Sequence, residues 1–157
     1  MKAVRHFGIV VRDLQGSLHF YRDLLGLKVV KAMDETGEFI DLLLSLKDAR
    51  VTTIKMSADN GPTLVEILAF NSHSRDPCGD YEAFRVGPSH IAFTVDDLDA
   101  VYHHLLNAEV HFNAPPQLSP DGSAKVTFCR DPDGTLVELV EVLKTAVSSS
   151  EFSSQQA

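Results

Sequence analysis

The sequence predicts an α+β fold made of two copies of one module, and two repeats carry this prediction. A histidine-bearing segment at residues 4–14 reappears at residues 88–98, where His90 takes the place of His6. A second segment, at residues 63–68, reappears at residues 135–140, where Glu138 takes the place of Glu66. A repeat inside one chain reports on architecture without any comparison to other proteins. The second interval is shorter than the first, so the first copy and its connector are longer than the second copy.

The first module is expected to begin with a strand followed by a helix. Residues 4–11 are expected to form the strand, and Asp13 is a suitable N-cap for the helix. The helix should bury one apolar stripe, formed at offsets of four, three and four by Leu14, Leu18, Tyr21 and Leu25. Gly26 then supplies the left-handed residue that commonly ends a helix.

The rest of the first module is expected to be mostly strand. Residues 28–33 and 51–56 are predicted strands, and residues 59–61 form the turn of a hairpin whose second strand is residues 63–70. Residues 39–46 are apolar enough for a strand, but periodicity does not separate Leu42-Leu43-Leu44 within them from a buried helical turn.

The second module is expected to repeat this order. Its predicted elements are a strand at 89–95, a helix from Asp97 to about Asn107, a loop at 115–116, a strand at 124–129, a turn at 131–134 and a strand at 135–142. The predicted organisation is a first module at residues 1–70, a connector at 71–87, a second module at 88–144 and a disordered tail at 145–157.

Composition indicates a soluble protein that acts on a small molecule. The net charge is −8, from 14 basic and 22 acidic residues. The basic residues are scattered along the sequence, so they predict no basic patch that would bind nucleic acid. No apolar run approaches the roughly 20 residues that a membrane span needs. The first residues lack a secretory signal, and Cys78 and Cys129 have no Cys-x-x-Cys spacing, so a reducing cytoplasm is the expected location.

The two repeated histidines are expected to lie on the open face of their strands, which is the face that points away from the helix. Side chains alternate faces along a strand, so His6 shares its face with Gly8, and His90 shares its face with Ala92. The bulky residues of both strands point the other way, toward the helix. Small neighbours leave space beside each histidine, which is typical of a cavity wall.

Two glutamates complete the repeated set. Glu66 and Glu138 each interrupt an otherwise apolar strand, and burying an unpaired carboxylate costs several kcal/mol. A bound cation removes that penalty, and two imidazoles with two carboxylates suit a divalent first-row metal. The alternative is two core histidines with two solvated glutamates on edge strands. Glu141 faces away from Glu138 and has Ala69 as its repeat partner, so we interpret it as a structural or surface residue.

Several motifs resemble the vicinal oxygen chelate superfamily, which includes glyoxalase I, methylmalonyl-CoA epimerase, extradiol dioxygenases, and fosfomycin and bleomycin resistance proteins. They are His6 with Val11-Arg12-Asp13-Leu14, the segment 20–27, His90-Ile91-Ala92-Phe93, and Asp131-Pro132-Asp133-Gly134 before Glu138. The resemblance covers about residues 3–143. It implies two tandem βαβββ modules that form a curled mixed sheet around a metal site.

The resemblance also implies a site and a reaction. His6, Glu66, His90 and Glu138 occupy the family's metal-ligand positions, and this set is similar to that of bacterial glyoxalase I. The expected cofactor is a divalent ion: nickel, cobalt, zinc, manganese or iron. The expected activity is that of a metal-dependent lyase or isomerase, with Glu138 as the first choice for the base and Glu66 as the second.

Other functions stay open from the sequence. An epimerase of the methylmalonyl-CoA type is a close alternative, and an Fe(II)-dependent dioxygenase needs only three of the four ligands. A non-enzymatic binder of the drug-resistance type needs no metal. A homodimer is the expected assembly, and the sequence leaves open whether each site lies within one chain or is shared between two.

Overall fold

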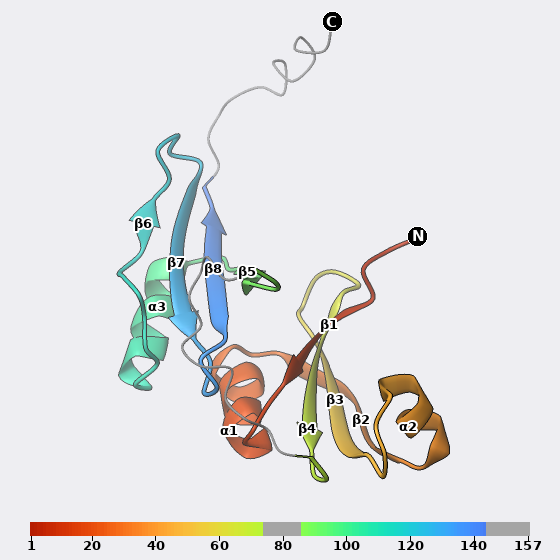
Figure 1. The fold of residues 1–157 in the computed structure, drawn as a ribbon. Helices are drawn as coiled ribbons and strands as arrows, with labels where there is room; N and C mark the ends of the chain where they lie inside the picture. The colour runs from red at the N-terminus through yellow and green to blue at the C-terminus, as the bar shows by residue number, and fades with distance from the viewer. Residues whose placement is uncertain (74–85, 144–157) are drawn as a thin grey trace, which may run out of the picture. The chain divides into compact units, whose positions relative to one another are not determined.

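The computed structural model describes residues 1–73 and 86–143, which divide into two units (Figure 1). The first unit is Met1–Ser89 with Arg130–Thr135, and the second is His90–Cys129 with the chain from Leu136 onward. Each unit contains one four-stranded mixed sheet, which confirms the prediction of an α+β fold from two tandem modules. Most of the expected connector, the whole of the expected tail and Cys78 lie outside the described residues.

The first sheet has the strand order β1-β4-β3-β2. Its strands are β1 (His6–Val10), β2 (Lys28–Thr36), β3 (Arg50–Ser57) and β4 (Leu64–Phe70). β1 runs parallel to β4, and the other neighbours are antiparallel. Along β1, Ile9 is buried while His6, Gly8 and Val10 are exposed, as strand alternation predicts. The histidine therefore lies on the open face of the sheet.

The first helix is short and changes type. Asp13 caps α1 (Leu14–Leu18), as expected, by accepting a hydrogen bond from the backbone N–H of Gln15. The chain then continues as η1 (His19–Leu24), a π-helix in which the Leu25 N–H donates to the Phe20 carbonyl at 3.0 Å. This wider turn buries both aromatic rings of η1, Phe20 and Tyr21. Spacing alone predicted a regular helix throughout.

Residues 39–46, which periodicity left undecided, form most of a second helix, α2 (Glu38–Leu44), and the turn after it. The extra length of the first copy falls between η1 and β3, where α2 lies. Ile40 of α2 packs on Ala49 and Val51, and Leu68 packs against this cluster. Because Leu68 shares its strand face with Glu66, α2 covers part of the face that carries this glutamate.

The second sheet has the order β5-β8-β7-β6. Its strands are β5 (His90–Thr94), β6 (Gln117–Leu118), β7 (Ala124–Arg130) and β8 (Leu136–Val142), with α3 (Leu98–Asn107) after β5. Asp97 caps α3, and the helix buries Leu98 and Leu105. The two-residue strand β6 was not predicted, because it follows the prolines at 115–116 and is too short to show alternation. No helix in the described ranges is long and apolar enough to cross a membrane.

The turn between β7 and β8 is part of the first unit, and it contains a buried carboxylate, that of Asp131. Asp131 accepts a hydrogen bond from the Tyr21 hydroxyl at 2.9 Å and from the backbone N–H groups of Asp133 and Thr135. Arg12 pairs with Asp133 at 2.6 Å. Burial raises the pKa of Asp131 above 3.8, and the hydrogen bond from Tyr21 opposes that rise.

Replacing Asp131 with Asn should therefore change how stability depends on pH. Since the folded pKa is raised, the contribution of this carboxyl is fully present below its unfolded pKa and is lost as pH rises through its folded pKa. The Asn variant, which mimics the neutral form, should gain stability relative to the unmodified protein as pH rises from acid to neutral. Urea unfolding of both proteins across this range measures the difference, and a difference independent of pH would contradict the assignment.

Candidate metal centre

In the first unit, neighbouring strands bring His6 and Glu66 together. His6 Nε2 lies 3.0 Å from Glu66 Oε2. The parallel register of β1 and β4 sets Gly8 directly opposite Glu66, so the facing residue has no side chain and the imidazole of His6, two residues earlier on β1, can reach the carboxylate. Glu66 is only 8% exposed, which makes a charged partner necessary.

A lysine that sequence reasoning missed also contacts this glutamate. Lys55 Nζ lies 3.2 Å from Glu66 Oε1, so each carboxylate oxygen of Glu66 has its own partner. Lys55 stands directly opposite Glu66 in the antiparallel pairing of β3 and β4. The signal was present in the sequence, because folding the predicted hairpin about its turn at residues 59–61 places these two residues side by side.

The second unit holds the equivalent pair. His90 Nε2 lies 3.2 Å from Glu138 Oε2, and Ala92 stands opposite Glu138 in the parallel pairing of β5 and β8. The side chains are 38% and 22% exposed for His90 and Glu138, so this pair is more open than the first. The ring of Phe128 meets the His90 imidazole edge to face, with centroids 5.4 Å apart. This contact helps to orient the imidazole.

Each pair offers one imidazole nitrogen and one carboxylate oxygen that face each other across about 3 Å. These are donors that a divalent first-row metal accepts, so the chemistry of the residues present fits such an ion. The two pairs belong to different units. Within the described ranges, no three His, Cys, Asp or Glu side chains gather as a group that could hold a metal. That all four residues bind one ion stays a prediction.

Glu141, three residues beyond Glu138 on β8, has a structural role. Its carboxylate accepts a hydrogen bond from the backbone N–H of Leu98 at 2.9 Å, at the start of α3. Lys125 Nζ lies 3.6 Å from the same oxygen. Strand alternation thus separates Glu141, on the helix side, from Glu138 on the open side.

Replacing Glu141 with Ala should lower stability and leave metal binding unchanged. The substitution removes one acceptor at a helix N-terminus, which typically costs about 1 kcal/mol. Urea unfolding measures the loss, and metal titration of the same protein supplies the second readout. A lower metal affinity in the folded variant would show that Glu141 belongs to the metal centre.

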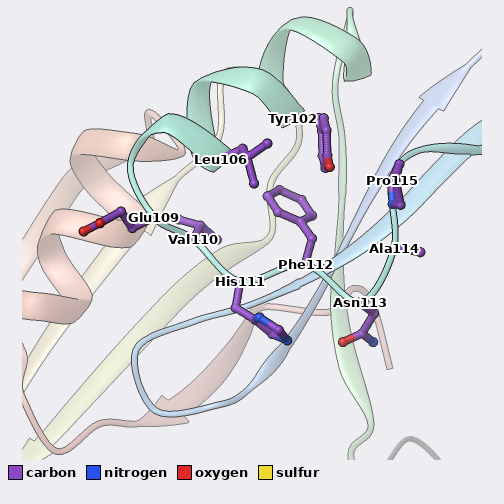
Figure 2. A pocket seen from close by; sticks show the side chains of 9 residues that line it. All are labelled: Tyr102, Leu106, Glu109, Val110, His111, Phe112, Asn113, Ala114 and Pro115. Carbon is purple, nitrogen blue, oxygen red and sulfur yellow. The ribbon is translucent and has the colours of Figure 1, made fainter.

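A separate hollow lies beside α3 in the second unit (Figure 2). It has a volume of about 400 Å³, and the rings of Tyr102 and Phe112 meet in its wall with centroids 4.7 Å apart. Figure 2 shows the Phe112 ring between Leu106 and Tyr102. None of the predicted metal ligands lines this hollow, so it is distinct from the candidate metal centre.

Comparison with known proteins defines the family. Residues 3–139 match the Glyoxalase/Bleomycin resistance protein/Dioxygenase superfamily, and the chain belongs to this superfamily. The resemblance inferred from the His6 and His90 motifs is therefore confirmed.

Individual relatives differ in how much is known of them. The uncharacterized protein YaeR of Escherichia coli is 29% identical over 90% of this chain and 97% of its own length. A lactoylglutathione lyase of Pseudomonas aeruginosa is 30% identical over 87% of this chain and 80% of its own length.

Solved structures show the same fold. A glyoxalase family protein from Bacillus cereus superposes with a TM-score of 0.82 at 20% identity, covering 91% of this chain and 95% of that one. The trypanothione-dependent glyoxalase I of Leishmania major gives a TM-score of 0.60 at 22% identity, covering 90% and 87% respectively.

Proposed function

We propose that this chain is a metal-dependent lyase or isomerase of the glyoxalase I type, which moves a proton next to a metal-chelated oxygen of a small substrate. One observation carries the proposal: both units hold a His–Glu pair at the same positions of the repeat, in a chain of the glyoxalase superfamily. The homodimer and the cytoplasmic location belong to the same proposal.

The residues proposed to hold the ion are His6, Glu66, His90 and Glu138. When bound, a divalent metal acts as a Lewis acid that makes the C–H beside the chelated oxygens more acidic. The protein then has to accept that proton at a carboxylate oxygen and return it to the neighbouring carbon. A carboxylate close to the chelated oxygens can do both, because it is charged before the transfer and neutral after it.

Glu138 is the better placed of the two glutamates for this proton transfer. Both oxygens of Glu66 are engaged, one near His6 and one near Lys55. Among the described residues, Glu138 has His90 as its only close charged partner, which leaves the second oxygen available. Glu138 is also the more exposed of the two side chains. These contacts support Glu138 as the base and Glu66 as a ligand.

The test measures metal uptake first and enzymatic turnover second. The purified protein, stripped with a chelator, is titrated with nickel, cobalt, zinc, manganese and iron(II), and uptake of one ion per chain is expected. Each loaded form is then given the hemithioacetal of methylglyoxal and glutathione, and separately a methylmalonyl-CoA epimer in D₂O. Product thioester or deuterium incorporation supports the proposal, and absence of metal uptake contradicts it.

A further inference from the structure

A row of paired residues crosses the first sheet at the level of Glu66. Gly8 of β1 pairs with Glu66 of β4, Glu66 pairs with Lys55 of β3, and Lys55 pairs with Lys31 of β2. Directly paired residues point to the same face of a sheet, so both lysines share the open face with the carboxylate. Neighbouring strands are about 4.8 Å apart, which puts the lysines one and two strands away from Glu66.

Both ammonium groups have capacity for a further partner. Lys55 is 20% exposed at its side chain, and Glu66 accounts for one of the three protons that its ammonium can donate. Lys31 is exposed, and no ion pair joins it to any described residue. Two further charged groups of β2 share this face by their pairing with β3, and both are engaged: Glu35 accepts a hydrogen bond from Thr53, and Lys28 pairs with Asp59.

Opposed like charges are unfavourable for the sheet. Two lysines directly across from each other in an antiparallel pair repel, and this repulsion destabilises the pairing. The chain as a whole carries a net charge of −8, so its composition does not account for two cations beside each other here. An anion bound between Lys31 and Lys55 would relieve the repulsion.

The second unit shows that the fold does not require these lysines. The repeat alignment that matches Glu66 with Glu138 also matches Lys55 with Thr127, whose hydroxyl donates to the Ala114 carbonyl at 2.6 Å. Lys125 of the same strand pairs with Asp99 at 2.6 Å and lies near Glu141. The pair of cations is therefore particular to the first sheet.

We propose that Lys55 and Lys31 bind an anionic group of the substrate, either a carboxylate or a phosphate. Within the substrate, this group lies close to the oxygens that chelate the metal. The inference rests on the proposed function, because it places this anionic group relative to the metal ligand Glu66. It restricts the substrate class: a neutral chelating compound makes no ion pair with this part of the site.

Three chelators that differ only in their tail test the inference. Acetohydroxamate binds metals through two neighbouring oxygens and has a neutral tail, malonate monohydroxamate adds a carboxylate, and phosphonoacetohydroxamate adds a phosphonate. Their dissociation constants are measured by calorimetry on the metal-loaded protein. At least one anionic chelator should bind about tenfold more tightly than acetohydroxamate, the factor expected of one charge-assisted hydrogen bond. The preferred tail distinguishes a carboxylate substrate from a phosphate substrate.

Lys31→Met should lose this advantage while its acetohydroxamate affinity stays the same. In Lys55→Met the anionic tails should likewise lose their advantage over acetohydroxamate measured on the same variant, a ratio that cancels any effect of removing the contact between Lys55 and the metal ligand Glu66. Lys28→Met is the matched control, since Lys28 lies on β2 but pairs with Asp59 at 2.6 Å. If metal and acetohydroxamate bind but neither anionic tail improves affinity, the inference is wrong and the proposed function stands. If the advantage of an anionic tail persists when Lys55 and Lys31 are both replaced by Met, the inference is likewise wrong and the proposed function stands. If the protein takes up no metal, both are wrong.

Discussion

Replacing Glu138 with Gln is expected to lower kcat about 1,000-fold, within the range that a general base contributes. The amide keeps the shape of the side chain and an oxygen that can still face a metal, but it does not accept a proton. The loss should therefore appear in kcat more than in KM or in metal uptake. Thioester formation from the hemithioacetal, followed with the metal-loaded variant, measures it.

Two further variants make this result specific. Glu141→Gln is the matched control, because Glu141 lies on the same strand but binds the start of α3, and its kcat should stay near that of the unmodified protein. Glu66→Gln tests the alternative base. A large kcat loss in Glu66→Gln, with near-normal turnover in Glu138→Gln, would reverse the roles of the two glutamates.

Removing either histidine is expected to weaken metal binding by at least about 100-fold, since even partners that only support a metal ligand cost 10–100-fold when lost. His6→Ala and His90→Ala should have similar effects, because each unit supplies one imidazole to the same ion in our proposal. Calorimetric titration of the chelator-stripped proteins measures both affinities.

The control for these histidines is His103→Ala, an exposed histidine on α3. Its metal affinity should equal that of the unmodified protein. If only one of the two substitutions, His6→Ala or His90→Ala, weakens metal binding, the ion is held within one unit, and the four-residue site is wrong.

Much of the fold follows from local rules that the sequence displays. Alternation along β1 and β5 placed His6 and His90 on the open face, and the same rule placed Glu141 on the opposite side from Glu138. Asp13 and Asp97 began helices as capping residues do. These features depend on near neighbours in the chain, which is why they could be predicted.

Other features depend on contacts between distant residues. The π-helix η1 buries both Phe20 and Tyr21, and Tyr21 reaches Asp131, which lies 110 residues further along the chain. Helix α2 forms from a run whose periodicity fits either a strand or a helix, and its packing of Ile40 on Val51 decides between them. Neither contact leaves a local signature in the sequence.

Lys55 is an intermediate case. Its contact with Glu66 follows from the hairpin register, which the turn at residues 59–61 defines. Lysine is not a usual metal ligand, so residue type alone does not point to it. The strand register does, and the pairing of β2 with β3 adds the second lysine, Lys31.

The central claim is that His6, Glu66, His90 and Glu138 bind one divalent metal ion. Anomalous X-ray diffraction from crystals of the metal-loaded protein, collected at the absorption edge of the metal, tests it most directly. We predict one anomalous peak per chain, bonded to these four side chains, whether they come from one chain or from two. A peak bonded to other residues, or to only one His–Glu pair, would contradict the claim.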